Sequence, residues 1–310
     1  MPELPDVVVY LEALTPRIVG QPLQRINLLS PFVLRSVDPP IASVHGRIVR
    51  RLRRLGKRIV LAFGPSTGSG SPRAESRGDD ELFLVLHLMI AGRLRWREPG
   101  QKPGMGPKLI LATLEFPNGT LFFTEASSKK RASMQLVAGE AALAAIGRGG
   151  LEPLDATLDE FRDALIRENH TVKRALTDPR LFSGIGNAYS DEILHAARMS
   201  PLKLTQSMKP DEIERLYGAT RDTLLAWIDR LRASVGDRFP EKVTAFRDDM
   251  AVHGRFRKPC PVCGAPVQRI VYAENECNYC ARCQTGGRLL ADRSLSRLLR
   301  EDWPKSLDEI

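Results

Sequence analysis

The stretch from Cys260 to Cys283 reads CPVCGAPVQRIVYAENECNYCARC. It holds two Cys-x-x-Cys pairs separated by sixteen residues, a spacing typical of a zinc site. A β-hairpin with one pair at each end places four thiolates about 2.3 Å from the ion, and leaves no open coordination position. We therefore expect one structural Zn²⁺ per chain. The predicted ligands are Cys260, Cys263, Cys280 and Cys283. Cys277 would close a gap of only thirteen residues, so we assign it no ligand role.

The region before this stretch, from Gly149-Gly150 onward, carries a helical pattern. Polar caps and prolines mark the starts of the helices. The linker is expected at 151–157, and the helices at 158–168, 171–177, 187–197, 210–216 and 219–233. A short helix with inward leucines is also expected at 292–300, in the extension beyond the cysteines.

Residues 183–192 read SGIGNAYSDE and contain a glycine-rich turn at the start of a helix. Two glycines before Asn187 allow the backbone to approach a ligand and leave N–H groups there, which suits a phosphate. The same turn is also explained as a plain connection between helices, with Asn187 as the N-cap. The residues alone leave both interpretations open.

The first 150 residues combine one helix with many short strands. The helix is expected at 6–19, supported by Val7, Tyr10, Leu11 and Leu14. Strands are expected at 23–29, 47–54, 58–63, 82–88, 109–115, 120–124 and 133–137, a spacing that favours a β-sandwich or barrel. A Gly/Ser/Pro-rich tract at 64–80 predicts a flexible loop. The arginines of 47–58 face either DNA or plain solvent.

Behind Met1 the chain begins Pro2-Glu3-Leu4-Pro5. If Met1 is cleaved, Pro2 presents a secondary amine, and an α-amino group has an ordinary pKa of roughly 8. Such an amine can attack a sugar carbon and form an iminium, while the adjacent Glu3 carboxylate transfers protons. The tetrapeptide alone also fits an ordinary proline-rich helix start.

Length and charge narrow the classes of function. A chain of 310 residues is long enough for about two domains. The formal net charge of +9 favours a polyanionic partner, and nucleic acid is the leading one. Paired cysteines indicate a reducing compartment, and no signal peptide or membrane span is evident. We expect a cytoplasmic, nucleoid-associated monomer that is not bound to a membrane.

These features together resemble the formamidopyrimidine-DNA glycosylase and endonuclease VIII family of DNA-repair enzymes. The resemblance spans residues 2–283. It rests on Pro2-Glu3-Leu4-Pro5, Gly56-Lys57, His87-Leu88-Met89-Ile90-Ala91-Gly92, Gly184-Ile185-Gly186-Asn187-Ala188-Tyr189 and Tyr279-Cys280-Ala281-Arg282-Cys283-Gln284.

The resemblance implies an α+β multidomain fold. An N-terminal helix and two-sheet β-sandwich form a catalytic domain (1–150), followed by a helix–two-turn–helix DNA-binding domain (151–254). A zinc β-hairpin (255–284) and a C-terminal extension (285–310) complete the chain. The implied activity is that of a bifunctional DNA glycosylase and abasic-site lyase in base-excision repair, acting on damaged, oxidised bases in double-stranded DNA.

The resemblance also implies residue roles. Pro2 would attack C1′ of the damaged nucleotide and Glu3 would protonate the sugar ring oxygen. Lys57 and Asn187 would grip phosphates around the lesion. Asp6 and Glu192 would support the active site.

The sequence departs from the family pattern at four places. Asp6 stands where the family has Glu, and Ile90 replaces the Met that acts as a wedge. Lys129, Lys130 and Arg131 lie where the family carries void-filling Arg and Phe, and are expected to meet phosphates. Asn275 replaces the arginine at the tip of the zinc hairpin. These departures leave an alternative: a lesion-binding protein with the same fold and weak or no glycosylase activity. Because a binding protein needs neither Pro2 nor Glu3, the enzyme is preferred.

Overall fold

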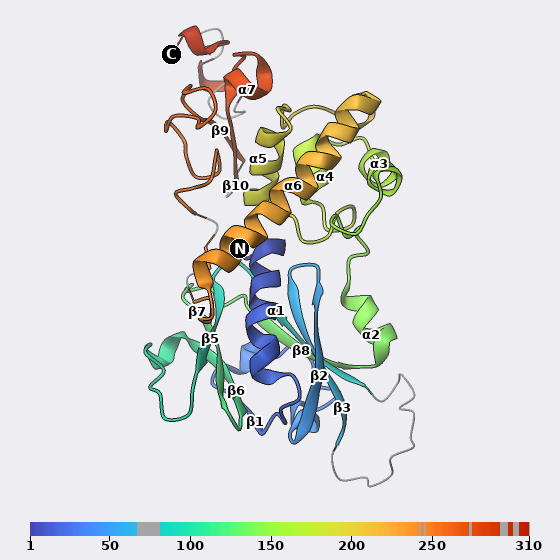
Figure 1. The fold of residues 1–310 in the computed structure, drawn as a ribbon, viewed down its shortest axis with the longest axis vertical. Coiled ribbons are helices and arrows are strands. Elements are labelled where there is room, and N and C mark those ends of the chain that lie inside the picture. Colours follow the sequence, from blue (N-terminus) through green and yellow to red (C-terminus); the bar gives the residue numbers. More distant parts are fainter. Residues whose placement is uncertain are drawn as a thin grey trace. The chain divides into compact units, whose positions relative to one another are not determined.

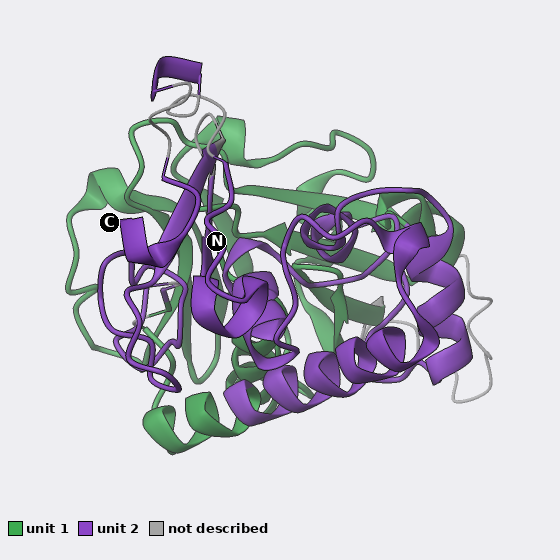
Figure 2. Ribbon diagram, turned by 90° about the horizontal axis from the view of Figure 1, so that it is seen from above, with its two compact units in different colours: residues 1–148, 228–243 green, residues 149–227, 244–310 purple. Residues whose placement is uncertain are grey.

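The computed structural model describes residues 1–66, 81–241, 243–244, 246–272, 275–291, 297–299 and 304–309. Most of the predicted 64–80 loop and of the helix predicted at 292–300 lies outside these residues. The chain divides into two compact units, which Figure 2 distinguishes by colour. Unit 1 comprises residues 1–148 and 228–243, and unit 2 comprises residues 149–227 and 244–310.

Unit 1 begins with helix α1 (Leu4–Ile18), which starts two residues before the predicted helix. Pro5 is tolerated in the first turn because the N–H groups there have no partner within the helix. Val7, Tyr10, Leu14 and Ile18 recur at helical spacing and are fully buried. This apolar face packs into the core of the unit.

Two four-stranded antiparallel sheets follow (Figure 1). The first has the order β1-β6-β7-β5, with β1 (Arg25–Leu28), β6 (Ile110–Phe116), β7 (Gly119–Glu125) and β5 (Gly92–Arg97). The second has the order β2-β3-β4-β8, with β2 (Arg47–Leu55), β3 (Arg58–Ser66), β4 (Leu82–His87) and β8 (Ser133–Ala138).

The two sheets share one hydrophobic core. Leu61, Phe63 and Leu84 of the second sheet belong to the same buried cluster as Leu114 and Phe123 of the first. This arrangement confirms the predicted two-sheet sandwich. Strand β5 was missing from the predicted strands, although its residues alternate between buried and half-buried.

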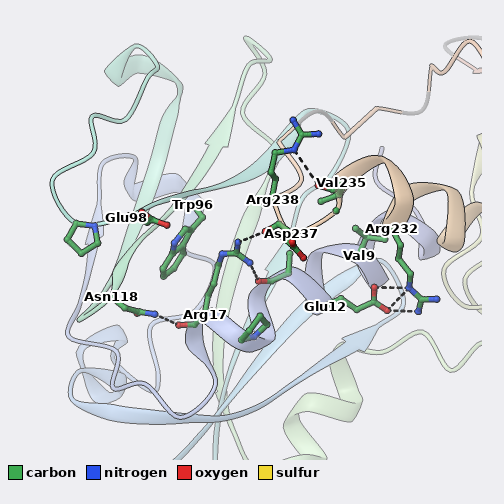
Figure 3. A pocket seen from close by; sticks show the side chains of 14 residues that line it. Val9, Glu12, Arg17, Trp96, Glu98, Asn118, Arg232, Val235, Asp237 and Arg238 are labelled. Carbon is green, nitrogen blue, oxygen red and sulfur yellow. Dashed lines mark hydrogen bonds and ion pairs between the residues drawn. The ribbon is translucent and has the colours of Figure 1, made fainter.

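The stretch 228–243 completes unit 1 by packing against α1. The Arg232 guanidinium contacts Glu12, with Nε 2.9 Å from Oε2. Phe239 packs its ring 5.9 Å from that of Tyr10. A pocket of about 730 Å³ lies here, lined by residues of α1, by Trp96 and by the end of helix α6 (Pro210–Val235). Figure 3 shows Arg17 crossing it to reach the carbonyl of Asp237.

Unit 2 is helical in its first part. Its helices are α3 (Leu158–Ile166), α4 (Val172–Thr177) and α5 (Asn187–Ala196), and α2 (Gly139–Ile146) precedes them in unit 1. Thr157 caps α3 by accepting the N–H of Glu160. Phe161 lies with its ring centroid 4.7 Å from that of Phe182, which anchors α3 to the loop before α5.

Helix α6 (Pro210–Val235) corrects a prediction. The sequence suggested a break between 216 and 219, but one continuous helix runs through Gly218. Glycine costs helix stability without forbidding the helix, and the buried Leu216, Leu224 and Trp227 on either side supply the packing.

The last part of unit 2 is a two-stranded antiparallel hairpin of β9 (Gln268–Tyr272) and β10 (Asn275–Tyr279), followed by α7 (Ala281–Thr285). The helices, the two-sheet sandwich and this cysteine-flanked hairpin together confirm the predicted fold class. Short 3-10 helices cover 31–33, 41–44, 107–109, 205–207 and 307–309. Among the described residues, no helix is both long and apolar enough to cross a membrane.

The continuity of α6 makes a prediction about Gly218. A Cβ there meets no atom within 4 Å, so Gly218→Ala should stabilise the protein by about 0.5–1 kcal/mol. Gly236 is the matched control, since it is equally open but has a φ of +55°. Gly236→Ala should cost about 1 kcal/mol because a left-handed conformation disfavours a side chain. Urea unfolding measures both, and destabilisation by Gly218→Ala would contradict the continuous helix.

Candidate active site and nucleic-acid contacts

The chain start is buried and ordered by a carboxylate. Pro2 and Glu3 precede α1, and the Glu3 side chain is only 2% exposed. The Glu3 N–H donates to Oδ2 of Asp6 at 2.9 Å, half of a capping box. Asp6 therefore reaches the helix start despite being shorter than the family's glutamate.

Several charges surround the terminal amine. Burial lowers the pKa of the Met1 α-amino group below its ordinary value. Glu3 and Asp6 raise this pKa, while Arg93 and Lys57 lower it. A lowered pKa leaves more of this Met1 amine unprotonated near neutral pH. The structure thus brings three predicted residues together with Arg93, which the sequence motifs did not reveal.

Lys57 lies in the two-residue turn between β2 and β3, where Leu55 pairs with Arg58. Across the sheet, Arg58 pairs with His87 at the end of β4. Burial, followed by the charges of Arg58 and Lys57, lowers the pKa of His87 to about 4. His87 is therefore neutral at physiological pH and adds no charge beside Lys57.

The predicted wedge, Ile90, occupies the turn between β4 and β5 and is 59% exposed. Met89 beside it has a φ of +51°, a conformation that is unfavourable for a side chain. The turn is braced by Arg93, whose Nη1 donates to the carbonyl of Ile90 at 3.1 Å. Arg93 thus links the wedge turn to the charges around the amine.

The loop with Lys129, Lys130 and Arg131 is held by a buried carboxylate. Oε2 of Glu125 accepts the N–H groups of Arg131 and Ala132 at 2.9 and 3.0 Å. The Lys130 ammonium donates to the backbone carbonyl of Glu125. Lys129 and Arg131 are exposed, as expected for residues that would contact phosphates.

In unit 2, Asn187 is the first residue of α5, and Gly186 is the N-cap. The interpretation of Asn187 as an N-cap is therefore wrong. Its Nδ2 donates to the carbonyl of Glu276 on β10 at 2.7 Å. Gly184 before it has a φ of +81°, which favours glycine. The glycine turn thus joins the start of α5 to the hairpin.

A buried ionic cluster lies one helical turn further along α5. The fully buried Asp191 contacts Nζ of Lys173 at 2.5 Å and Nδ1 of His253 at 2.7 Å. Burial alone would raise the pKa of Asp191, but these two partners outweigh it and hold the pKa below its ordinary value. Lys173 also donates to the carbonyl of Asn187 at 2.7 Å. The cluster therefore fixes the start of α5, where Asn187 lies.

The Glu192 carboxylate is held by backbone N–H groups. Its carboxylate accepts the N–H groups of Ala251, Val252 and His253 at 2.8, 2.9 and 3.0 Å. Burial raises the pKa of Glu192, and the three hydrogen bonds partly offset that effect. Within unit 2, this predicted supporting residue fixes the segment before the cysteines.

Four thiols gather at the base of the hairpin. The Sγ atoms of Cys260, Cys263, Cys280 and Cys283 all lie within 4.8 Å of one another. The distance between Cys263 and Cys280 is 3.4 Å, and that between Cys260 and Cys283 is 3.9 Å. A tetrahedral zinc–sulfur site has sulfur atoms about 3.8 Å apart, so this cluster fits a metal ion.

Three further residues, Cys277, His195 and Asn275, lie in or near the hairpin. Cys277 is buried in a separate core with Ile270 and Tyr279, and burial raises its pKa. Nε2 of His195 lies 3.3 Å from Sγ of Cys260, a contact that the sequence did not reveal. The backbone of Asn275 pairs with Tyr272, which places it beside the hairpin turn.

Sequence motifs missed Arg93, Lys173, Asp191 and His253. Their partners are distant in the chain, and no local spacing signals them. The one available signal was Asp191 beside Glu192, since two adjacent carboxylates in a buried helix require partners.

Two domain models from one family match the chain. The formamidopyrimidine-DNA glycosylase N-terminal domain matches residues 1–129, and the formamidopyrimidine-DNA glycosylase H2TH domain matches residues 150–237. The formamidopyrimidine-DNA glycosylase of Deinococcus radiodurans is 31% identical, over 95% of this chain and all of the relative. That of Symbiobacterium thermophilum is 29% identical, over 92% of this chain and 89% of the relative.

Two solved structures from the same family are also similar to this chain. The MutM (Fpg) protein of Thermus thermophilus aligns with a TM-score of 0.71 and 29% identity, covering 91% of this chain and 98% of that one. Lactococcus lactis Fpg (MutM), in complex with DNA containing an oxidized pyrimidine, aligns with a TM-score of 0.75 and 25% identity. That alignment covers 92% of this chain and all of the other.

The buried cluster predicts a large effect of Lys173→Met. Removing the ammonium leaves Asp191 buried without its main counter-charge, so the free energy of unfolding should fall by about 3–5 kcal/mol. Arg162→Met is the matched control, because Arg162 pairs with Asp159 on the exposed surface and its loss should change stability far less. Urea unfolding compares the two, and equal losses would argue against a buried ion pair.

Proposed function

Because this chain belongs to the formamidopyrimidine-DNA glycosylase family, we propose that it excises damaged bases through the amine of Pro2. It is a DNA glycosylase and abasic-site lyase of base-excision repair. The observation that supports the Pro2 assignment is the buried chain start: Pro2 and Glu3 are buried, and the Met1 amine directly before them is influenced by Glu3, Asp6, Lys57 and Arg93.

The proposed reaction starts after Met1 is removed. The nitrogen lone pair of Pro2 attacks C1′ of the damaged nucleotide, and the bond between C1′ and the base breaks with its electrons leaving on the base. Glu3 takes the proton released by the Pro2 nitrogen and passes it to the sugar ring oxygen, so the ring opens and an iminium remains on Pro2, while the departed base takes a proton from solvent. Loss of a proton from C2′ then expels the 3′ phosphate and nicks the strand.

Phosphate contacts orient the DNA in this proposal. Lys57 and Asn187 grip phosphates beside the lesion, and the exposed Lys129 and Arg131 hold the backbone further away. Lys130 contributes less, because its ammonium already donates to the carbonyl of Glu125. Ile90 enters the stack as the wedge.

The substrate we infer is double-stranded DNA with oxidised bases or abasic sites. The Lactococcus lactis structures contain DNA with Fapy-dG, an abasic site or an oxidized pyrimidine. The positive charge of this chain suits such a partner. We infer a cytoplasmic protein that is associated with the nucleoid by DNA binding. The alternative of a lesion-binding protein is not favoured, because the chain keeps the buried Pro2 and Glu3.

We infer that the four clustered thiols hold one structural Zn²⁺. When bound, the ion cross-links the two ends of the hairpin and supplies no chemistry to the reaction, since all four coordination positions are taken by sulfur. Glu276 lies on the hairpin, and its backbone carbonyl accepts a hydrogen bond from Asn187. By fixing the hairpin, the ion would therefore also help to position Asn187 for the proposed phosphate contact.

Asn275 affects the 3′ end that we expect after the strand is nicked. An arginine beside the hairpin turn would hold a phosphate by a bidentate, charge-assisted contact, and asparagine has no charge and less reach. We infer that positioning of the sugar weakens after the first elimination. The main product should then carry an unsaturated aldehyde at its 3′ end, and Asn275→Arg should shift products toward the 3′ phosphate.

The amine assignment is tested by borohydride trapping on abasic-site DNA. The protein without Met1 should form a covalent adduct, and an N-terminal extension should abolish it. Glu3→Gln should bind lesion DNA normally but excise about 10²–10⁴-fold more slowly. Lys129→Gln, a variant outside the amine's surroundings, should still be trapped. Trapping that survives the extension would point to an internal lysine.

Metal content tests the zinc proposal. The purified protein should contain one Zn²⁺ per chain, and Cys277→Ser should retain it because Cys277 lies in a different core. Cys280→Ser should lose it and destabilise unit 2. Elemental analysis decides this, and loss of zinc from Cys277→Ser would overturn the ligand set.

A further inference from the structure

His195 is a buried polar residue in the last turn of α5 that the proposed reaction does not use. It is only 6% exposed, and its neighbours Ile193 and Leu194 are buried as well. Burying a polar ring is costly unless the ring is hydrogen-bonded. In the described part of the chain, the imidazole has one hydrogen-bond partner, Sγ of Cys260, which lies 3.3 Å from Nε2. That partner is one of the four predicted metal ligands.

His195 lies outside the group of predicted ligands. The Sγ atoms of Cys260, Cys263, Cys280 and Cys283 all lie within 4.8 Å of one another, and among the described residues no histidine nitrogen joins them at that range. Four sulfurs already complete a tetrahedral zinc site. A zinc-bound thiolate carries no proton and can only accept, so Nε2 of His195 must be the donor. The contact is therefore an N–H···S hydrogen bond to a ligand.

Such a donor matters because the predicted site is negatively charged and buried. Four thiolates and one Zn²⁺ together leave two net negative charges. Cys260 and Cys280 are 2% and 0% exposed, so water contributes little to dispersing that charge. Cys280 receives the backbone N–H of Cys283 at 3.5 Å, from within its own turn. For Cys260, a side chain from another element supplies the hydrogen bond.

The donor is held in place by the helix that carries it. Helix α5 contacts both β10 and α7 (Figure 1). At its start, Nδ2 of Asn187 donates to the carbonyl of Glu276 at 2.7 Å. Beyond its end, the side chain of Gln284 in α7 donates to the carbonyl of Met199 at 2.9 Å. All of these residues belong to unit 2, and together they fix the imidazole beside Cys260.

We propose that His195 is a positioning residue of the metal site, which donates its Nε2–H to the Cys260 thiolate and so slows loss of the ion. The inference rests on the proposed Zn²⁺ site and adds a residue that cysteine spacing does not predict. Removing a hydrogen bond to a metal ligand costs about 10- to 100-fold in metal affinity.

The first measurement is zinc retention by the full-length protein, in competition with a chromophoric chelator. His195→Phe keeps a buried ring but removes the donor, so its zinc affinity should fall by about 10- to 100-fold. His195→Leu, a second variant without a donor, should behave in the same way. His195→Gln can offer an amide N–H near the position of Nε2 and should restore most of the affinity. His170→Phe is the matched control in unit 2, because the His170 imidazole contacts Glu168 and should not affect zinc.

The second measurement separates the hydrogen bond from packing. In the protein loaded with Co²⁺ in place of Zn²⁺, the sulfur-to-metal charge-transfer bands report on the thiolates directly. Loss of a donor raises the energy of the sulfur lone pairs, so the bands of His195→Phe should move to longer wavelength. The bands of His195→Gln should stay near those of the wild type.

Zinc affinity and cobalt bands of His195→Phe that match the wild type would overturn the inference while the zinc site stands. Weaker binding with unchanged bands would also overturn it, by assigning His195 a packing role alone. A wild-type protein that binds neither ion would remove the proposed zinc site, and the inference with it. Borohydride trapping would still test the Pro2 assignment separately.

Discussion

Two adjacent buried carboxylates, Asp191 and Glu192, govern the arrangement of unit 2. Burying an unpaired carboxylate is costly, so each needs partners from elsewhere in the chain. Asp191 takes a lysine from α4 and a histidine from the segment before the cysteines. Glu192 takes three N–H groups from that same segment. Helix α5, with its glycine turn, is thereby locked to the part of the chain that leads into the thiol cluster.

At the chain start in unit 1, burial also disfavours a charged group, but there it changes the pKa of an amine. Here burial acts on a cation, and it lowers the pKa of the terminal amine while Glu3 and Asp6 oppose the shift. We propose that the same burial favours the unprotonated form of the Pro2 amine once Met1 is removed. The Asp6 carboxylate orders the start of α1, and we propose that the Glu3 carboxylate transfers protons. Glu3 and Asp6 therefore contribute both to the stability of the chain start and to the proposed chemistry.

Departures from the family pattern are absorbed locally. The shorter Asp6 still accepts the N–H of Glu3, and the loop without void-filling residues is shaped by the buried Glu125. The wedge turn keeps its form although Met89 occupies a left-handed conformation, because Arg93 donates to carbonyls within it. The backbone path is thus maintained by hydrogen bonds to buried groups, which frees the exposed side chains to vary.

Local patterns in the sequence determined much of this protein. The paired cysteines, the alternation in most strands, the apolar face of α1 and the Pro2-Glu3 start depend only on near neighbours along the chain. Tertiary structure decided the rest. In the sequence, Gly218 indicates a break between two helices. In the structure, packing on both sides of Gly218 stabilises one continuous helix, α6. The partners of Asp191 and the contact between His195 and Cys260 join residues that are far apart in sequence. Burial creates those interactions, and burial exists only once the chain has folded.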